Sequence, residues 1–399
     1  MDALTTPSNW QRVRLGDIAE IKRGASPRPI ENPKWFCANS NVGWVRISDI
    51  SKNSRFLYKT AQKLSKKGIE KSRFIKQNSL IMSMCATIGK PIITKIDTCI
   101  HDGFVVFENP KIDLNYLYYF LCYIEKEWLE SGQQGSQVNL NVDLIKNKEV
   151  FCPKDLNEQI AIANILSDVD RYLYSLRALI LKKESVKKAL SFELLIQRKR
   201  LKGFNQNWQR VKVKDFGIII TGSTPLTQIS EYWNGTISWI TPTDINDNKD
   251  IFNSERKITQ KGLDTIRMIP KNSVLVTCIA SIGKNAILRV NGACNQQINA
   301  IIPNKDFNAD FVYYLMENNK QYLLGKAGVT ATYIISKQVF EEIDFFVPKD
   351  LNEQIAIANI LSGLDNEIIS LKNKKRQFEN IKKALNHDLM SAKIRVLKE

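Results

Sequence analysis

Two histidines are the only side chains of the 399-residue sequence that could complete a Ser-His-Asp or Cys-His arrangement. His387 lies between Asn386 and Asp388 in a segment with the periodicity of a long helix, and His101 follows Cys99 by two residues. Cys99 and His101 supply only two of the four ligands of a structural zinc site. The seven cysteines include no Cys-x-x-Cys pair, which indicates reduced thiols. These residues predict neither nucleophilic catalysis nor a metal site.

Phosphate-binding and methyl-transfer motifs are incomplete. Gly89-Lys90 and Gly283-Lys284 lack the Gly-x4 lead and the following Ser or Thr of a P-loop, so we interpret each as a tight turn whose lysine is available to a phosphate oxygen. The Asn-Pro-Lys-Trp run at 32–35 is similar to the Asn-Pro-Pro-aromatic element of adenine methyltransferases, but its later counterpart at 230–233 shares only the Trp. We predict a non-catalytic protein, with a methyltransferase or nuclease of unrecognised active site as the alternative.

The charge balance favours a polyanionic partner. The chain has 58 Lys and Arg against 41 Asp and Glu, and the excess is concentrated in residues 1–203, which hold 33 against 21. Such an excess attracts phosphate backbones. The longest apolar run, 117–124, is far below the ~20 residues that span a bilayer, and the N-terminus lacks a signal pattern. We expect a soluble cytoplasmic protein that binds nucleic acid and not a membrane.

The sequence contains an internal repeat of two homologous units. The fifteen residues 153–167, PKDLNEQIAIANILS, recur without change at 348–362, an offset of 195. Several shorter landmarks recur in the same order: Asn-Trp-Gln-Arg-Val at 9–13 and 207–211, Gly-x-[Ser/Thr]-Pro at 24–27 and 222–225, Trp44 and Trp239, and Ile-Gly-Lys at 88–90 and 282–284. Because Trp10, Trp44, Trp208 and Trp239 occupy repeated positions, we interpret them as core residues.

The two variable bodies, 9–152 and 207–347, have the pattern of mixed α+β domains. Short β-branched and aromatic runs at 79–84, 103–107, 273–277 and 299–302 predict strands. Apolar periodicity predicts helices over 114–129 and 309–324.

The repeated tails are predicted to be helical. Asp155 and Asp350 are expected to cap a short helix that ends near Leu166 or Leu361, and a long helix follows. Apolar residues spaced by three and four predict a coiled-coil seam. Its members are Val169, Tyr172, Leu176, Leu179, Val186, Leu190 and Leu194 in the first copy, and Leu364, Ile368, Leu371, Phe378, Ile381, Leu385 and Leu389 in the second. We expect the two copies to pair antiparallel; the alternative is that each packs on its own body.

This order of duplicated landmarks resembles the DNA-specificity subunit of Type I restriction-modification systems over essentially the whole chain. The resemblance implies an α+β fold of two homologous mixed α/β target recognition domains, joined by two long antiparallel coiled-coil helices as a pseudo-twofold internal repeat. The implied domains are target recognition domains at 8–152 and 204–347, a central helical spacer at 153–203 and a C-terminal helical spacer at 348–399.

The resemblance also implies a function. The chain would be a non-catalytic, sequence-specific subunit that recognises a bipartite site in double-stranded DNA. It would dock two modification methyltransferase subunits and the restriction or translocase subunits. No cofactor is expected in this chain, because S-adenosylmethionine, ATP and Mg would be held by the partner subunits. The expected partner-binding residues are the repeated Asn-Glu-Gln triplets: Asn157, Glu158 and Gln159, and Asn352, Glu353 and Gln354.

Base recognition needs donors and acceptors at base edges, whereas phosphate contacts give position and affinity. The candidate DNA-binding residues of the first body are Lys22, Arg23, Ser26, Arg28, Arg46, Lys52, Arg55, Lys90 and Gln137. Those of the second body are Thr221, Ser223, Thr224, Arg256, Lys257, Lys284, Gln296, Thr330 and Thr332.

Overall fold

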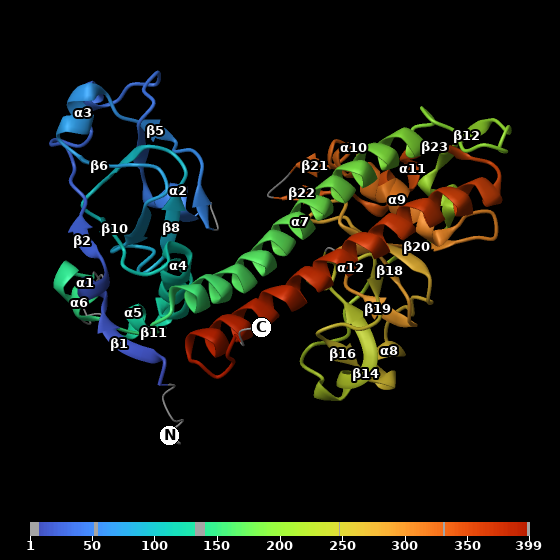
Figure 1. Ribbon diagram of the computed structural model, residues 1–399. Helices are drawn as coiled ribbons and strands as arrows, with labels where there is room; N and C mark the ends of the chain where they lie inside the picture. The colour runs from blue at the N-terminus through green and yellow to red at the C-terminus, as the bar shows by residue number, and fades with distance from the viewer. Residues whose placement is uncertain (1–7, 52–54, 132–139, 247, 330–331, 397–399) are drawn as a thin grey trace. The chain divides into compact units, whose positions relative to one another are not determined.

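The structure is a computed structural model that describes residues 8–51, 55–131, 140–246, 248–329 and 332–396. Its contacts divide the chain into two compact units (Figure 1). Unit 1 comprises Met1–Arg177 and Lys374–Glu399, and unit 2 comprises Ala178–Asn373. Each unit contains one body of strands and short helices, together with a segment of each of the two long helices. Lys52, Gln137 and Thr330, three of the predicted DNA-binding residues, lie outside the described residues.

The body of unit 1 is built on two small sheets. Its strands are β1 (Trp10–Arg14), β2 (Glu20–Arg23), β3 (Gly43–Val45), β4 (Phe56–Leu57), β5 (Gln62–Lys63), β6 (Arg73–Ile75), β7 (Leu80–Ser83), β8 (Pro91–Thr94), β9 (Thr98–Ile100), β10 (Phe104–Glu108) and β11 (Glu149–Pro153). Its short helices are α1 (Leu15–Ile18), η1 (Pro33–Trp35), α2 (Ile47–Ser51), α3 (Lys66–Glu70), α4 (Leu114–Tyr123), α5 (Glu125–Ser131) and α6 (Val142–Asn147). One sheet has the order β2-β10-β7-β8-β4, the other β5-β3-β9-β6, and β1 pairs with β11.

The body of unit 2 repeats this plan. Its strands are β12 (Trp208–Lys212), β13 (Gly217–Thr221), β14 (Trp233–Ile240), β15 (Asp250–Ile251), β16 (Lys257–Ile258), β17 (Ser273–Thr277), β18 (Asn285–Leu288), β19 (Gly292–Cys294), β20 (Ile298–Pro303), β21 (Gly328–Val329), β22 (Tyr333–Ile334) and β23 (Asp344–Pro348). Its short helices are η2 (Val213–Phe216), η3 (Ser230–Tyr232), α8 (Gln260–Leu263), α9 (Ala309–Asn318), α10 (Lys320–Leu324) and α11 (Lys337–Glu342). The sheet orders are β13-β20-β17-β18-β15 and β16-β14-β19, with β12 paired to β23 and β21 to β22.

The predicted mixed α/β character and the predicted core are confirmed. The four strands expected from β-branched runs form as β7, β10, β17 and β20, and all five residues of β17 are buried. Helices α4 and α9 pack on these sheets and bury a central run of six residues each. The repeated tryptophans lie in the core, with Trp44 fully buried and Trp10, Trp208 and Trp239 at most 5% exposed.

Each repeated tail is one helix of 40 residues, α7 (Leu156–Leu195) and α12 (Leu351–Met390). Asp155 and Asp350 accept a hydrogen bond from the N–H two residues further on, as expected for residues that cap a helix start. The predicted break near Leu166 and Leu361 is wrong. Ser167 donates to the carbonyl of Ala163 within the helix, and Gly363 is an exposed position where glycine costs a helix only about 1 kcal/mol.

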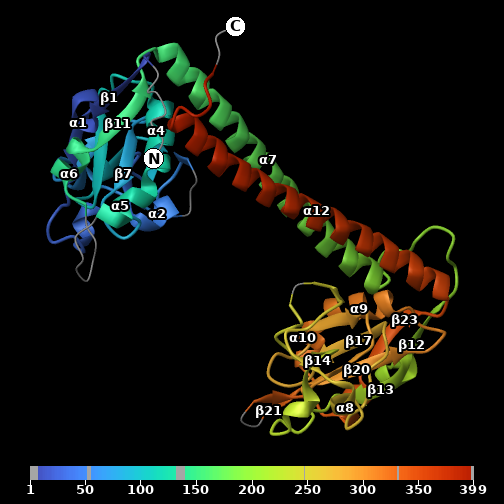
Figure 2. The same cartoon turned by 90° about the horizontal axis from the view of Figure 1, so that it is seen from below.

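The predicted antiparallel pairing is confirmed within each unit, and both views show α7 and α12 side by side (Figure 2). In unit 1, Tyr172 lies against Phe378, with ring centroids 4.6 Å apart, and Lys382 forms an ion pair with Asp170. In unit 2, Lys183 pairs with Glu367 at 2.8 Å. Rising numbers on α7 meet falling numbers on α12, which defines the antiparallel direction.

The predicted seam is only partly correct. Leu176 and Ile368 are buried, but Leu179, Val186 and Ile381 are 38%, 44% and 50% exposed. Ion pairs at positions beside the predicted seam also join the two helices: Lys183–Glu367, Lys187–Asp365, Glu184–Lys372 and Asp170–Lys382. The C-terminal ends of the helices are also deeply buried: Leu194 and Leu195 lie in the core of unit 2, and Leu389 and Met390 in that of unit 1.

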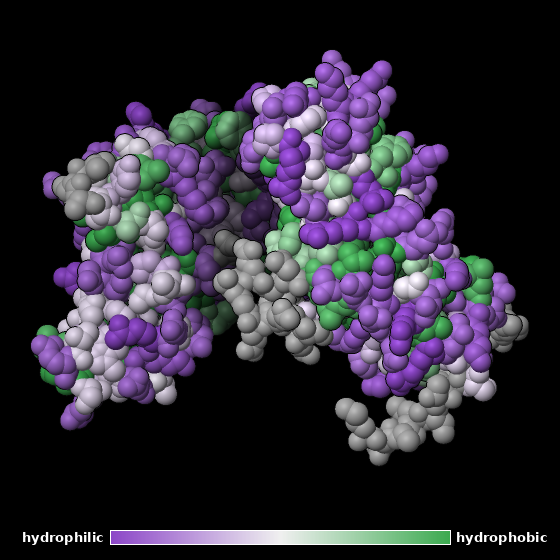
Figure 3. Space-filling model, turned by 90° about the vertical axis from the view of Figure 1, so that its left-hand side faces the viewer, coloured by the Kyte–Doolittle hydropathy of each residue, from purple (hydrophilic) through white to green (hydrophobic). Residues whose placement is uncertain are grey.

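Most of the face drawn in Figure 3 is hydrophilic, and hydrophobic residues form small separate patches on it. None of the helices in the described part of the chain is long and apolar enough to cross a membrane. Nor do the described residues contain a group of three or more His, Cys, Asp or Glu side chains that could hold a metal ion.

Candidate nucleic-acid interface

The Gly-x-[Ser/Thr]-Pro element of each body forms a loop that is fixed against a turn from elsewhere in the same body. We call residues 24–28 and 222–226 the glycine loops, and residues 101–103 and 295–297 the facing turns. The facing turn follows β9 in unit 1 and β19 in unit 2. Each joins two strands of the body at the point where the glycine loop leaves β2 or β13.

The same two backbone hydrogen bonds build this arrangement in both units. In unit 1, Gly24 N donates to the carbonyl of Phe104 at 2.8 Å, and Ala25 N to that of Ile100 at 3.1 Å. In unit 2, Gly222 N donates to Ile298 at 3.0 Å, and Ser223 N to Cys294 at 2.8 Å. The two bodies therefore present equivalent backbones, on which different side chains are displayed.

Glycine is required at the head of each loop because the facing turn is too close for a side chain. A Cβ atom on Gly24 would lie 2.0 Å from the carbonyl oxygen of His101, and one on Gly222 would lie 2.2 Å from that of Asn295. Neither backbone has room to move, since both turns continue into buried strands. The repeated glycine is thus explained by close backbone contact.

In unit 1, Asp102 of the facing turn accepts hydrogen bonds from the polar side chains of the glycine loop. Its carboxylate accepts hydrogen bonds from Ser26 Oγ at 2.7 Å and from the Arg28 guanidinium at 3.0 Å. Its backbone carbonyl accepts one from Arg23 Nε at 2.8 Å. Burial opposes ionisation of Asp102, but the Ser26 hydrogen bond and the Arg28 charge more than offset it and lower the pKa of this carboxyl. An ionised Asp102 therefore orients a basic loop.

The neighbouring His101 is neutral. Burial lowers its pKa to about 4, and the positive charge of Arg46 acts in the same direction, against the opposing charge of Asp102. The geometry agrees, because His101 Nδ1 accepts a hydrogen bond from Gly103 N at 2.9 Å and so carries no proton. The ring packs between Trp44 and Phe104. The 3.8 Å contact between His101 and Asp102 is accordingly not an ion pair.

In unit 2, the equivalent positions hold neutral side chains. Thr224 Oγ1 donates to Gln296 Oε1 at 2.6 Å, in the place of the Ser26–Asp102 contact. Trp239 Nε1 donates to the carbonyl of Ser223 at 3.0 Å, which ties the loop to the body. The exposed Arg256 lies 4.0 Å above the ring of Trp233 and 4.9 Å from that of Trp239. The arginine thus stands beside the loop, supported on two aromatic rings.

The structure brings eight of the predicted DNA-binding residues into these two clusters: Arg23, Ser26, Arg28 and Arg46 in unit 1, and Ser223, Thr224, Arg256 and Gln296 in unit 2. The other described candidates lie apart from them. Lys22 pairs with Glu20 and Glu108, and Thr221 donates to Asn299. Lys90, Lys257 and Thr332 are half-buried, and Lys284 is exposed.

Arg55 does not lie on a DNA-accessible surface, and its prediction as a DNA contact is wrong. The residue is 8% exposed, and its guanidinium donates to Tyr119 Oη, Ser167 Oγ and the side chain of Asn115. It therefore links α4 to α7 inside unit 1. Composition identified it as basic, but its partners come together only in the folded body.

The sequence predicted that the Asn-Glu-Gln triplets bind partner subunits, but their Glu and Gln side chains point into the body. Gln159 and Gln354 are 2% and 1% exposed, and each accepts from a backbone N–H and donates to a backbone carbonyl in its own body. Glu158 accepts from the Trp10 indole at 3.1 Å, and Glu353 from that of Trp208 at 3.2 Å. Only Asn157 and Asn352 are exposed. These triplets fasten the helix start to its body.

A second repeated cluster, which the sequence did not reveal, joins the body to both helices. In unit 1, Tyr119 Oη donates to Asp170 at 2.6 Å, and Lys382 Nζ lies 2.6 Å from the other carboxylate oxygen. In unit 2, Tyr314 and Lys187 hold Asp365 in the same way, at 2.7 and 2.5 Å. Burial raises the pKa of both tyrosines, so the phenols remain donors. Each carboxylate therefore connects three elements.

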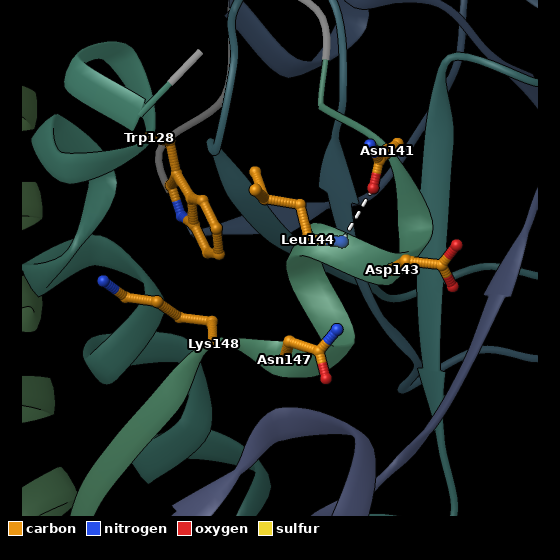
Figure 4. A pocket seen from close by; sticks show the side chains of 6 residues that line it. All are labelled: Trp128, Asn141, Asp143, Leu144, Asn147 and Lys148. Atoms are coloured by element: carbon orange, nitrogen blue, oxygen red, sulfur yellow. Dashed lines mark hydrogen bonds between the residues drawn. The ribbon is translucent and has the colours of Figure 1, made fainter. Parts of the chain in front are cut away.

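A pocket of about 420 Å³ opens in unit 1 beside Trp128, at the end of α6 (Figure 4). Two of its polar side chains have local roles. Asn141 caps α6 by accepting from Leu144 N at 2.7 Å, and Lys148 pairs with Glu127. We assign this pocket no part in recognition.

Comparison with known proteins agrees with the duplicated plan. The family model described as the Type I restriction modification DNA specificity domain matches twice, at residues 7–183 and 205–380. The specificity subunit of the Type I restriction enzyme MjaIX from Methanocaldococcus jannaschii is 35% identical over 184 residues, which make up 45% of this chain and 42% of that protein. A Type I restriction enzyme specificity subunit of Escherichia coli is 26% identical over 273 residues, 65% of each chain. Both alignments span less than two thirds of the relative's length.

The fold has a match over nearly its full length. The crystal structure of the Type I restriction-modification S subunit from M. genitalium superposes with a TM-score of 0.62 at 14% sequence identity, covering 97% of both chains. The two family-model matches cover most of the sequence, and each contains a glycine loop, a facing turn and the start of a long helix. The chain therefore belongs to the Type I restriction-modification DNA specificity domain family.

Proposed function

We propose that this chain is the specificity subunit of a Type I restriction-modification complex, and that each unit recognises one half of a bipartite site in double-stranded DNA. In this role the chain itself catalyses no reaction. It selects the sequence, and subunits docked on it carry out the modification and restriction.

One observation carries this proposal. The glycine loop and facing turn are built twice by the same backbone hydrogen bonds, yet they display different side chains in the two units. A constant frame with variable donors and acceptors is what recognition of two different base sequences requires. The side chains involved, Arg28, Ser26, Thr224 and Gln296, are of the types that bind base edges.

Partner docking is supported by apolar residues that are exposed at equivalent positions of the two long helices. Ile165 and Ile360 are 36% and 37% exposed, Tyr174 and Ile369 are 74% and 49% exposed, and Val186 and Ile381 are 44% and 50% exposed. Each pair is separated by 195 residues, the offset of the repeat. Exposed apolar residues that recur at equivalent positions are suited to two copies of one partner. We propose that Tyr174 and Ile369, the most exposed of these pairs, contact the two modification methyltransferase subunits, in place of the Asn-Glu-Gln triplets.

The remaining parts of the proposal concern what the partners supply. S-adenosylmethionine, ATP and Mg would be bound by the modification and the restriction or translocase subunits. The complex would act in the cytoplasm, where its DNA substrate is found.

DNA recognition is tested by selecting duplexes from a random library with the purified full chain. We expect enrichment of a two-part motif and an affinity that falls steeply as salt rises. Randomising one half of the selected motif should weaken binding, while changes between the halves should not. Equal binding to all sequences would contradict the proposal.

Docking is tested by the double variant Tyr174→Glu/Ile369→Glu. We expect it to bind DNA normally and to lose co-purification with the modification subunit, since charges would replace apolar contacts. The control is Ser175→Glu/Ser370→Glu, which alters exposed residues turned by about 100° around the same helices. Equal retention of the partner by both variants would contradict a docking role for Tyr174 and Ile369.

A further inference from the structure

The two glycine loops differ at positions that the shared backbone makes equivalent. Arg28 of unit 1 corresponds to Leu226 of unit 2, because each follows the proline of its loop. Asp102 corresponds to Gln296, because each is the second residue after the cysteine-containing strand and is bonded to the loop hydroxyl. The backbone of the loop and turn is common to both units, but the side chains that it carries differ in charge and polarity.

Unit 1 displays an oriented arginine. The Arg28 side chain is 73% exposed, although one of its terminal nitrogens is held 3.0 Å from Asp102. A guanidinium has five N–H donors, so this contact fixes its direction and leaves donors free. A fixed, exposed guanidinium is suited to the O6 and N7 acceptors of guanine.

Unit 2 displays an amide beside an apolar side chain. Gln296 is exposed, and its carbonyl oxygen accepts from Thr224, which leaves a second lone pair and the amino group free. An amide of this kind matches the N6 and N7 groups of adenine. Leu226 is 59% exposed and stands in the same loop, where an apolar contact is suited to the methyl group of thymine.

We propose that these residues determine one base pair in each half-site: a G·C pair for unit 1, recognised by Arg28, and an A·T pair for unit 2, recognised by Gln296 and Leu226. Asp102 and Thr224 are positioning residues, which hold Arg28 and Gln296 in the orientation that contacts the base. The inference rests on the proposed function, since it names the bases that the two units recognise.

The surroundings of the two loops support the assignment. Arg23 and Arg46 act on the facing turn of unit 1, whereas the sequence-equivalent positions of unit 2 hold Thr221 and Thr241, whose hydroxyls bond Asn299 and Asp244. The cluster of unit 1 therefore has three arginines, Arg23, Arg28 and Arg46, beside Asp102, as suits the acceptor-rich major-groove edge of guanine. In unit 2 the arginine of the cluster is Arg256, held over Trp233 and Trp239, and the loop and facing turn themselves display hydroxyls and an amide.

The test exchanges the residues between the units in the full chain. The variant Arg28→Leu/Asp102→Gln alters unit 1, the variant Leu226→Arg/Gln296→Asp alters unit 2, and each selects duplexes from a random library. We expect the first to lose G·C at one position of one half-site, by about 5- to 150-fold in relative affinity, and to accept A·T there. The second should show the reverse change in the other half-site. The unaltered half-site of each variant is the control for folding.

Single variants separate contact from positioning. Arg28→Lys should lower discrimination at the G·C position, because an ammonium lacks the two-donor fork. Asp102→Asn should keep guanine as the preferred base with weaker discrimination, whereas a merely structural role would weaken the whole half-site equally. If both exchange variants bind their original motif unchanged, the inference is overturned and the proposed function stands. If the unaltered chain selects no motif, the proposed function itself fails.

Discussion

At the scale of single residues, the protonation of His101 is coupled to folding in the acidic range. Its pKa falls to about 4 in the folded chain through burial, from an ordinary value near 6.5. Between these two values the unfolded chain binds a proton that the folded chain does not. The stability contributed by neutral His101 is therefore fully present above pH 6.5 and is lost as the pH falls toward 4.

We predict that His101→Asn removes this part of the acid sensitivity of unit 1. Asparagine occupies the equivalent position in unit 2, so the facing turn accommodates it. Between pH 7.5 and pH 5, the wild type should lose about 2 kcal/mol more unfolding free energy than the variant. Urea unfolding at the two pH values measures this difference. Parallel pH profiles would show that His101 is not buried as a neutral ring.

A second residue-scale prediction concerns the glutamates at the helix starts. Glu353 is 1% exposed and pairs with Arg200 at 3.2 Å as well as with Trp208. The partners of Glu158 within the described part of the chain are the neutral Asn9 and Trp10. Glu353→Gln should therefore destabilise unit 2 by about 2 kcal/mol, and Glu158→Gln should cost unit 1 less than about 1 kcal/mol. Hydrogen exchange of β12 and of β1, compared between the two variants, reports the two effects separately.

At the scale of elements, the Asp365 cluster fastens both helices to the body of unit 2. Asp365→Asn keeps the bond from Tyr314 but loses the charge that faces Lys187, and we expect a loss of about 1–2 kcal/mol in the unfolding free energy. Lys187→Met should cost less in the Asp365→Asn background than in the wild type. Equal costs in this double-mutant cycle would show that the two side chains are not coupled.

The elements also show how far the sequence alone predicted the molecule. The sequence predicted the strands and the buried tryptophans correctly, because β-branched runs and tryptophans at repeated positions are typical of residues that pack in a core. It misplaced Arg55 and the Glu and Gln of the triplets, whose partners include residues 46 to 153 positions away in the chain. The charge of Arg55 and the exact repetition of the triplets were interpreted as signs of contact with other molecules. These side chains instead form hydrogen bonds inside the protein.

The candidate site was predicted in part for the same reason. Ser26, Arg28, Thr224 and Gln296 were recognised by residue type, whereas Asp102 and Leu226 were missed. The contrast between His101-Asp102 and Asn295-Gln296 was visible in the sequence, but only the two backbone hydrogen bonds of each loop show that these pairs occupy equivalent places.

At the scale of the whole molecule, the uneven charge of the two repeats has a measurable consequence. Arg23 and Arg46 give unit 1 two positive charges that Thr221 and Thr241 do not give unit 2. If both contact phosphates, Arg23→Thr/Arg46→Thr should reduce the slope of log K against log salt by about 2. Thr221→Arg/Thr241→Arg should increase it. Titrations of one duplex at several salt concentrations measure both changes, and an unchanged slope would exclude phosphate contacts at these residues.

The burial of the two helix ends also sets an order of events during synthesis. The core of unit 1 includes Leu389 and Met390, which are made about 10–40 s after residue 177 at ordinary translation rates. All of unit 2 has been made by residue 373. The first unit to emerge from the ribosome is thus the last to be completed. Its apolar surface beside α4 stays uncovered until Leu389 and Met390 of α12 have been made. A nascent chain stalled before α12 is finished would expose that surface to chaperones, even though its N-terminal body is already complete in sequence.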